Sequence, residues 1–416
     1  MQIANLLNEY DKGFWDFKGT KKEGLHKLGK YPATMVAPMQ YELLSLLISN
    51  NKDFKTLLDP FVGSGTTLVE GCNLGLFDVC GIDINPYAVL LSEVKTHNYN
   101  RELLTGLDNR ISAKLFDVNF EYSVHDFPNI DKWFREDIKN SLSKIRAIIL
   151  DEEDTWIRKF LWVCFSEVIY KHSNDRTSTF KLHVKKEKDV AQIKDSCIEC
   201  FLQKVATNQK FLNINHQTTV HLMSGDSTHL LKNLKDSSID VICTSPPYGD
   251  NGTTVTYGQA TILFSKWIDC NDLRCDESLL SGYSAIDSAS LGSNSTLEEI
   301  PIISSAVNYI NLLSETKKRK VEKFIAGYYV ILKELSRVLS SGGYVLFTVG
   351  NRRVDGLQQP LDEITKEIFI QLGLAEETVF TRNILSKKMP SKVSCIENKG
   401  AVKSMNQETV LIFKKG

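Results

Sequence analysis

The chain has 416 residues, a length that suits a large catalytic core with inserted segments better than one average domain. Its hydrophobic fraction of 42% and charged fraction of 24% are ordinary for a folded globular protein, which excludes a chain dominated by disorder. The formal net charge of −1 excludes a globally basic surface, so any contact with nucleic acid must come from local patches.

Two absences indicate a reduced, cytoplasmic protein without a membrane anchor. The segment Met1–Asn5 has neither the basic region nor the apolar region of a secretory signal, and no apolar run approaches the roughly 18 residues of a membrane span. The cysteines are scattered without the spacing of a disulfide framework. Cys197 and Cys200 could form half of a zinc site with Cys270 and Cys275, but their irregular spacing favours ordinary thiols and no metal.

Short apolar runs with helical stretches between them predict a doubly wound α/β sheet. The expected strands are, in chain order, Lys55–Asp59, Asp78–Asp83, Thr219–Ser224, Ile239–Thr244, Tyr344–Val349, Leu374–Thr381 and Glu408–Phe413. The last two could pair as a hairpin. A helix over Thr66–Leu74 follows the first strand, and Pro86 begins another helix at a first-turn position that tolerates proline.

Two long segments interrupt this pattern. The first, between the second and third strands, has one buried helix face, carried by Trp156, Phe160, Val163, Cys164 and Val168. Whether it only packs or also touches the substrate stays open. The second, Gly249–Ser305, is rich in Ser, Gly and Asp and is expected to be irregular, as functional or disordered loops of that length are.

These observations divide the chain into six parts. We expect a basic N-terminal arm, a cofactor-binding half of the core, a helical insertion, a catalytic half of the core, an irregular insertion and a C-terminal part of the core. In that order they span residues 1–27, 28–96, 97–215, 216–250, 251–315 and 316–416.

The turn after the first strand has the composition of a cofactor cradle. Asp59, Pro60 and Phe61 lead into Gly63 and Gly65, and Thr66 and Thr67 then begin the helix. Glycines let backbone N–H groups approach a ligand that a β-carbon would block. The spacing is not that of a dinucleotide fingerprint, and no lysine follows as in a phosphate loop, so a nucleotide phosphate is a poor match.

Acidic residues at the ends of the next two strands complete the expected cofactor site. Asp83 stands where a carboxylate accepts hydrogen bonds from ribose hydroxyls, and Asp226 stands where a carboxylate can reach an adenine amino group. An adenosine without a phosphate chain, held at three successive strand ends, fits S-adenosylmethionine.

The segment Thr244–Tyr248 follows the fourth strand and has the composition of a grip for an amino group. Pro246 and Pro247 fix the backbone, so that carbonyl oxygens near Ser245, with its hydroxyl, can accept hydrogen bonds from an exocyclic –NH₂. Tyr248 offers a flat face for stacking on a base. An amine inside a duplex cannot reach such a site, so the base must be flipped out at a cost of a few kcal/mol.

Together the cradle and the grip resemble those of the DNA amino-methyltransferases, which act on cytosine N4 or adenine N6. Asp59–Thr67 is similar to their cofactor motif, and Thr244–Tyr248 to their catalytic motif in the Ser-Pro-Pro-Tyr form more typical of N4-cytosine enzymes. Three further segments look like family segments: Lys30–Val36, which contains Thr34 and would close over the methionine end of the cofactor, Gly81–Pro86, which contains Ile84, and Val349–Arg352. The similarity covers roughly residues 28–100 and 215–416. The cofactor motif precedes the catalytic motif here, whereas many N4 enzymes have the reverse order.

This resemblance implies a Rossmann-like methyltransferase sheet of seven strands with a C-terminal hairpin and with helical and loop insertions. It implies a site-specific methyltransferase that uses S-adenosylmethionine on cytosine N4 of double-stranded DNA. Such an enzyme works beside a cognate type II restriction endonuclease and is expected to be a monomer or a weak dimer. Adenine N6 is the nearest alternative. An RNA base methyltransferase fits less well, because those enzymes usually have Asp or Asn before Pro-Pro-Tyr.

Methylation at cytosine carbon-5 is excluded by the absence of a Pro-Cys dipeptide, in which related families present the cysteine nucleophile that this reaction needs. None of the ten prolines precedes a cysteine. Direct attack by the amine on the methyl group is therefore expected, with positioning supplying most of the acceleration.

Basic residues gather in three places where DNA phosphates could bind, which would make affinity salt-dependent. The clusters are Lys18, Lys21, Lys22, Lys27 and Lys30; Lys317–Lys320; and Arg382, Lys387, Lys388 and Lys392. We expect the base-reading residues in the two insertions.

Overall fold

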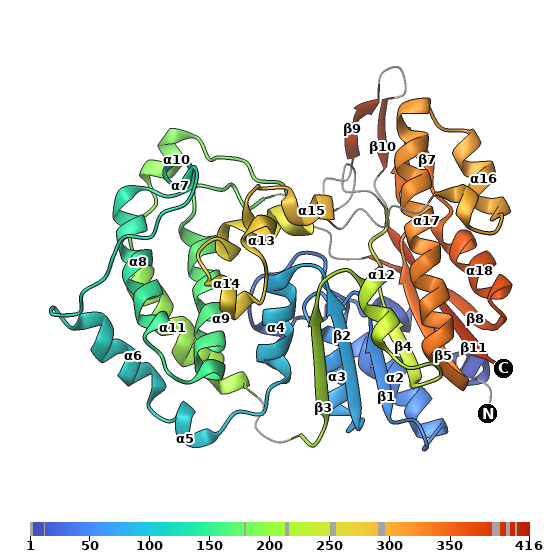
Figure 1. Cartoon of the computed structure of the whole chain (residues 1–416), viewed down its shortest axis with the longest axis horizontal. Coiled ribbons are helices and arrows are strands. Elements are labelled where there is room, and N and C mark those ends of the chain that lie inside the picture. The colour runs from blue at the N-terminus through green and yellow to red at the C-terminus, as the bar shows by residue number, and fades with distance from the viewer. Residues whose placement is uncertain are drawn as a thin grey trace.

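A seven-stranded mixed sheet forms the centre of the molecule in the computed structural model (Figure 1). The structure describes residues 3–11, 13–178, 180–212, 216–249, 255–289, 296–384, 392–396, 400–403 and 406–416. The strand order is β3-β2-β1-β4-β5-β11-β8. These strands are β1 (Thr56–Asp59), β2 (Asp78–Asp83), β3 (Thr219–Ser224), β4 (Ile239–Thr244), β5 (Leu339–Val349), β8 (Leu374–Asn383) and β11 (Gln407–Lys415). The predicted fold class is confirmed.

Strand direction divides the sheet into two parts. The five strands from β3 to β5 run parallel, whereas β11 is antiparallel to both β5 and β8. The predicted pairing of the last two strands is therefore confirmed. Two short hairpins stand outside the main sheet and comprise β6 (Arg353–Val354), β7 (Leu357–Gln358), β9 (Lys392–Ile396) and β10 (Gly400–Lys403).

The bounds of β2, β3 and β4 coincide with the predicted runs, those of β1, β8 and β11 differ by one or two residues, and β5 is the clearest difference. It begins at Leu339 rather than at Tyr344, because its first residues are polar and glycine-rich and do not read as a strand. Gly343 allows this extension: a Cβ there would lie 2.8 Å from the backbone oxygen of Asp240 on β4. The glycine-rich start of β5 thus packs against its neighbour by backbone rather than by side chains.

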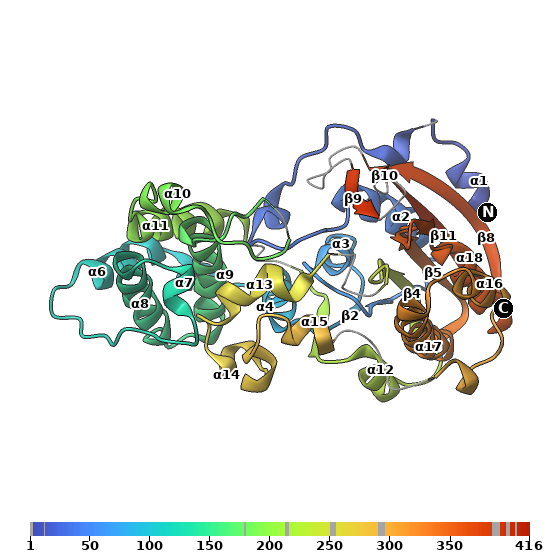
Figure 2. The ribbon, with the colours of Figure 1, turned by 90° about the horizontal axis from the view of Figure 1, so that it is seen from above.

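Side chains that alternate along each strand feed a core on each face of the sheet, as period-2 geometry requires. On β4, Val241 faces one core and Ile242 the other, and both are fully buried. The helices α2 (Ala37–Asn50) and α3 (Thr66–Asn73) cover the first face. The helices α16 (Ser304–Asn311), α17 (Glu315–Val338) and α18 (Leu361–Gln371) cover the second, as the view from above shows (Figure 2).

A helical lobe stands beside the sheet and docks on α4 (Pro86–Thr96) (Figure 1). Every residue of α4 is buried, because the sheet lies on one side of it and the lobe on the other. The remaining helices are α1 (Ile3–Leu7), α5 (Arg101–Leu104), α6 (Leu107–Phe116), α7 (Ile130–Trp133), α8 (Glu136–Leu150), α9 (Thr155–His172), α10 (Glu187–Ala191), α11 (Cys197–Asn208), α12 (Ser227–Leu230), α13 (Tyr257–Ser265), α14 (Cys270–Leu273) and α15 (Ala285–Ala289).

The centre of the helical lobe is α9, which contains the predicted buried face. Phe160, Val163, Cys164 and Val168 are fully buried, but so are residues on the other sides of the helix. α9 contacts α4, α8, α11 and α13, so it is enclosed rather than amphipathic. In the part of the chain that the structure describes, no helix is both long enough and apolar enough to span a membrane.

The second long segment differs from the prediction of an irregular loop. Between Gly249 and Ser305 the structure forms α13, α14 and α15, and α16 begins at Ser304. Ile262, Phe264 and Trp267 from this segment pack into the core of the helical lobe. The helices are short and their apolar residues are clustered, so helical periodicity was not visible in the sequence. Residues 250–254 and 290–295 lie outside the described part of the segment.

Candidate active site

Two left-handed glycines form the turn between β1 and α3. Gly63 has φ 51° and Gly65 has φ 76°, values that glycine adopts without strain. A Cβ on Gly63 would lie 3.2 Å from the Tyr31 ring, and a Cβ on Gly65 would lie 2.8 Å from the Ser92 hydroxyl of α4. The turn is thus held between an aromatic ring and a buried helix, which explains both glycines.

The carboxylate of Asp83, at the end of β2, holds this turn. It accepts hydrogen bonds from the backbone N–H of Gly63 and of Asn85, each at 2.8 Å. Burial raises the pKa of Asp83 to about 6, against the lowering effect of these hydrogen bonds. Asp83 also lines the cleft described below, so an oxygen that already accepts one backbone hydrogen bond has a second lone pair for a ligand hydroxyl.

The end of β3 joins the same turn. Asp226 begins α12 by accepting a hydrogen bond from the N–H of Thr228 at 2.8 Å. The neighbouring hydroxyl of Ser227 donates to the carbonyl of Pro60 at 2.6 Å. The three strand ends that the sequence predicted to hold a cofactor are therefore linked by hydrogen bonds.

Asp59 lies behind the glycine turn and connects it to the segment Thr244–Tyr248 after β4, which we call the acceptor loop. Its carboxylate accepts a hydrogen bond from the Thr244 hydroxyl at 2.6 Å and from the N–H of Phe61 at 3.1 Å. The side chain is fully buried, and burial raises its pKa to about 6. Asp59 was predicted as a cofactor residue, but the structure places it in the interior, between the two loops.

The acceptor loop is held from two directions. The Ser245 hydroxyl lies 3.1 Å from the Tyr248 hydroxyl, which donates to a carboxylate oxygen of Glu408 on β11, also at 3.1 Å. On the other side, Gly249 has φ 141° and packs against Arg352: a Cβ there would lie 2.4 Å from its Nε. The loop is therefore held by side chains from β11 and from the segment after β5.

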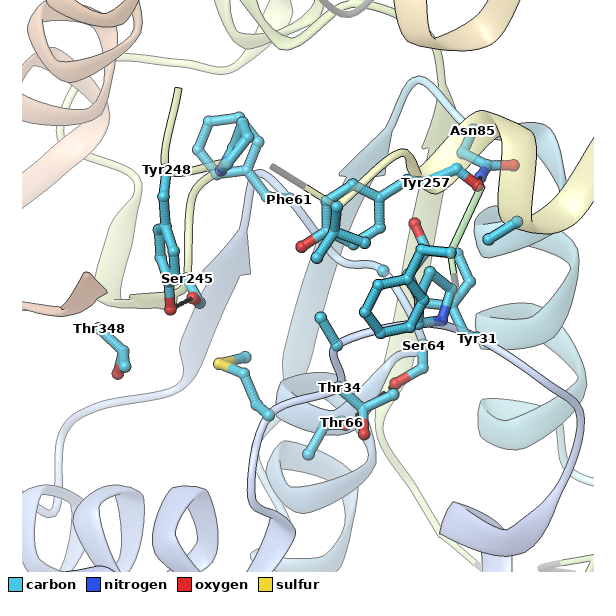
Figure 3. Close-up of a pocket in the computed structure, with 18 of the residues that line it drawn as sticks. Tyr31, Thr34, Phe61, Ser64, Thr66, Asn85, Ser245, Tyr248, Tyr257 and Thr348 are labelled. Atoms are coloured by element: carbon cyan, nitrogen blue, oxygen red, sulfur yellow. Dashed lines mark hydrogen bonds between the residues drawn. The ribbon is translucent and has the colours of Figure 1, made fainter. Parts of the chain in front are cut away.

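Residues of the glycine turn, which we call the donor turn, and residues of the acceptor loop line one cleft of 2410 Å³ between the sheet and the helical lobe. Figure 3 shows Ser245 and Tyr248 at one end, Tyr31 and Tyr257 at the other, and Phe61 between them in this view. The predicted residues on its wall are Thr34, Pro60, Phe61, Gly63, Thr66, Asp83, Ile84, Asp226, Ser245, Pro247 and Tyr248. The predicted residues that do not line it are Asp59, Gly65, Thr67 and Pro246.

Two aromatic residues of this cleft were not predicted as site residues. Tyr31 stacks on Tyr257 with 5.7 Å between ring centroids and 29° between ring planes. The Asn85 side chain, which caps α4, donates to Thr261 of α13 at 3.0 Å and so fixes the helix that carries Tyr257. Tyr31 lies within a segment that resembles a family segment, whereas no motif surrounds Tyr257. Only the fold brings α13 to the donor side of the cleft.

Lys95 was also not predicted as a site residue, because it lies inside a helix away from every motif. Its ammonium group is buried and donates to the carbonyl of Ser64 in the glycine turn at 2.8 Å. Burial lowers the pKa of Lys95 to about 7. This side chain therefore fixes the glycine turn from α4.

Basic residues border the cleft unevenly. Of the first cluster, Lys18, Lys21, Lys22 and Lys30 line it, whereas Lys27 lies over the ring of Phe211 at 5.3 Å. Lys317 of the second cluster lines it as well. In the third cluster, Arg382 is buried and forms an ion pair with Glu408. Lys387 and Lys388 and the side chain of Lys392 lie outside the described residues.

The cysteines considered for zinc give no sign of a metal centre. Cys197 and Cys200 are buried on α11, and Cys270 and Cys275 are half-buried near α14. Among the residues with described positions, no group of three or more His, Cys, Asp or Glu side chains could hold a metal ion.

The donor side of the cleft fits an adenosine that carries no phosphate chain. It presents the half-satisfied carboxylates of Asp83 and Asp226, which attract hydroxyl and amino donors and would repel phosphates. The glycine turn admits a ligand to backbone distance, and Tyr31 and Tyr257 supply apolar surface beside it. These features suit the hydroxyl, amino and sulfonium groups of S-adenosylmethionine.

Comparisons with known proteins return methyltransferases. The type II methyltransferase M.MvaI of Kocuria varians is 29% identical over 99% of this chain and 96% of its own length. M.BsoBI of Geobacillus stearothermophilus, also a type II methyltransferase, is 22% identical over 92% of this chain and 84% of its own length. An rRNA methyltransferase of Streptomyces viridochromogenes aligns in structure with a TM-score of 0.31 and 12% identity, over 94% of this chain and 88% of its own. No protein-family model matches the chain.

The buried carboxylate of Asp59 predicts a pH dependence of stability. Its pKa rises from 3.8 to about 6 on folding, so between these values the folded state binds more protons and stability falls as pH rises. Asp59→Asn cannot ionise but keeps an oxygen for Thr244 and Phe61, so its stability is expected to fall less over this range. Urea unfolding of the ligand-free protein at a series of pH values measures the difference.

Asp83 has a similar shift, so part of the pH dependence will remain in the variant. Asp53→Asn is the matched control, because Asp53 is exposed and its removal should leave the wild-type slope. Parallel pH profiles for Asp59→Asn and the wild type would contradict this assignment.

Proposed function

Because the chain belongs to the DNA methyltransferase family, we propose that it methylates the exocyclic N4 of cytosine in double-stranded DNA. S-adenosylmethionine is its methyl donor. The observation that carries the proposal is that the donor turn and the Ser-Pro-Pro-Tyr loop leave neighbouring strands, β1 and β4, and line one cleft. An acceptor amine held by the loop would lie beside a methyl group held by the turn.

S-adenosylmethionine supplies an electrophilic methyl group on a sulfonium. The chain's own residues have to hold the amine and direct its lone pair at that carbon. The nitrogen–carbon bond would form as the carbon–sulfur bond breaks, and the cationic product would then release one proton to solvent water. Pro246 and Pro247 keep the backbone carbonyls of the loop in place, and the Ser245 hydroxyl lies at the cleft wall. Such pre-organisation of two reactants is worth several kcal/mol of the barrier.

The size of the cleft supports a flipped base as the substrate. At 2410 Å³ it exceeds the usual range for a small-molecule pocket, so it has room for a donor and for a nucleotide with its backbone. Lys18, Lys21 and Lys30 are exposed at its border on one side, and Lys317 lines it from α17 on the other. We assign these lysines to the DNA phosphates on either side of the flipped nucleotide.

The Ser-Pro-Pro-Tyr form supports cytosine N4 as the target. Adenine N6 is the second candidate, since it also presents an –NH₂ and since the cofactor motif here precedes the catalytic motif. Because its relatives are type II methyltransferases, we propose that the protein works beside a cognate restriction endonuclease. We further propose that it is a monomer or a weak dimer.

The proposed target can be tested on host DNA. We expect expression of the protein to produce N4-methylcytosine, detected by mass spectrometry after digestion of the DNA to nucleosides. Ser245→Ala, expressed to the same level, is the matched control and should leave the DNA unmodified. Detection of N6-methyladenine instead would show that the target is adenine N6, the second candidate. Unmodified DNA together with newly methylated RNA would refute the proposal as a whole.

Substitutions on the donor side and on the acceptor side should have different effects on S-adenosylmethionine binding and on methyl transfer. Asp83→Ala removes a carboxylate that anchors the turn and faces the donor, so we expect it to weaken S-adenosylmethionine binding about 10- to 100-fold. Ser245→Ala should keep that affinity within about twofold and lose most of the methyl transfer, because its hydroxyl belongs to the acceptor side. Calorimetry measures the affinity, and a radiolabelled methyl assay measures transfer.

Asp78→Ala is the control for Asp83, since Asp78 starts the same strand at the opposite edge of the sheet. Unchanged affinity in Asp83→Ala would remove Asp83 from the donor site. Equal losses of donor binding in Ser245→Ala and Asp83→Ala would mean that the two pockets are misassigned.

A further inference from the structure

Glu408 stands at the acceptor end of the cleft, outside every motif of the sequence. It lies near the start of β11 and pairs across the sheet with Arg382 of β8. Their side chains form an ion pair and are 17% and 7% exposed, respectively. The Nε of Arg382 also donates to the carbonyl of Trp15 at 3.1 Å. The Glu408 carboxylate is therefore held by an arginine that is itself fixed.

The ion pair leaves Glu408 as a hydrogen-bond acceptor only. Arg382 occupies one carboxylate oxygen, and the other accepts from the Tyr248 hydroxyl at 3.1 Å. Burial and the neighbouring Glu408 charge raise the pKa of Tyr248 well above its ordinary value, so the hydroxyl keeps its proton. A phenol has one hydrogen to donate, and here that hydrogen points at Glu408.

The direction of this bond fixes the next one. The Ser245 and Tyr248 hydroxyls lie 3.1 Å apart, and by distance alone either could donate. Because the Tyr248 hydrogen is already committed to Glu408, Ser245 has to donate to the Tyr248 oxygen. The lone pairs of the Ser245 oxygen then remain available at the cleft wall, where Ser245 lies.

We infer that Glu408 is a positioning residue that sets the polarity of the chain Ser245–Tyr248–Glu408, so that Ser245 presents an acceptor to the substrate. An acceptor suits an exocyclic amine, which donates N–H. It disfavours a ring carbonyl at the same position, which would face lone pairs with no hydrogen between them. Glu408 would thus help the site to choose cytosine over thymine. This inference rests on the proposed function and extends it to a residue on the last strand of the sheet.

Glu408→Gln should reverse the chain while keeping its shape. Arg382 can only donate, so it will orient the amide oxygen of the glutamine toward itself and leave the –NH₂ facing Tyr248. Tyr248 must then accept from the glutamine and donate to Ser245, whose own hydrogen is driven toward the substrate amine. We expect single-turnover methyl transfer to a cytosine-containing duplex to slow by about 10- to 100-fold, with the affinity for S-adenosylmethionine within about twofold of wild type.

Two comparisons separate this role from general damage to the fold. Glu376→Gln is the matched control: Glu376 lies in the neighbouring strand β8, forms an ion pair with Lys366 at 2.6 Å and does not line the cleft, so both readouts should be unchanged. Tyr248→Phe removes the middle of the chain and frees Ser245 to rotate. Glu408→Gln should therefore add little further loss of rate in the Tyr248→Phe background, whereas a purely structural role would add its full effect in both backgrounds.

Each outcome of the experiment decides the inference. A rate for Glu408→Gln equal to that of Glu376→Gln would overturn it, and so would an equal loss in the presence and absence of the Tyr248 hydroxyl. Loss of donor affinity along with rate would show a structural role and overturn it as well. Failure of the wild-type protein to methylate any duplex would instead refute the proposed function, and with it the inference, and is seen before any variant is compared.

Discussion

The hydrogen bond from Thr244 to Asp59 is the constraint on which the arrangement of the site depends. Its length of 2.6 Å and its full burial join the end of β4 to the end of β1, and these are the strands from which the acceptor loop and the donor turn depart. The N–H of Phe61 shares the same carboxylate. One buried group therefore sets the spacing between two loops that are far apart in the sequence.

The helical lobe depends on the same frame, because it docks through α4, the helix that follows the donor strand β2. Glu93 of α4 accepts a hydrogen bond from Lys159 of α9 at 2.8 Å. Glu167 of α9 accepts from the backbone N–H of Gly29, just ahead of the segment that contains Thr34, at 3.3 Å. The lobe thus supports one wall of the donor side in addition to enclosing the cleft. We predict that the lobe also carries base-reading residues. DNA bound to them would contact a lobe that packs on α4, the helix whose Lys95 holds the donor turn.

Much of this fold could be predicted, because buried parallel strands are apolar runs that end at polar turns. The bounds of β2, β3 and β4 coincide with the predicted runs, and the glycine turn was recognisable from its composition and its place after a strand. Local pattern was enough at these places, since the strand, the turn and the helix that follows are contiguous.

Contacts between distant elements could not be read in the same way. Asp59 was expected to face the cofactor and instead faces Thr244, because only the pairing of β1 with β4 decides which neighbour a strand-end carboxylate meets. Glu408 and Tyr257 reach the cleft from the last strand and from a segment without visible periodicity. Whether the predicted site residues act as assigned remains a prediction.

The most direct test of this account is a double-mutant cycle across the Thr244–Asp59 hydrogen bond, with single-turnover methyl transfer to DNA as the readout. We predict that Asp59→Ala and Thr244→Val each slow transfer and that the double variant is no slower than the slower single variant, because each substitution removes the same hydrogen bond. Losses of activation free energy that add in the double variant would contradict the claim that this bond couples the donor turn to the acceptor loop.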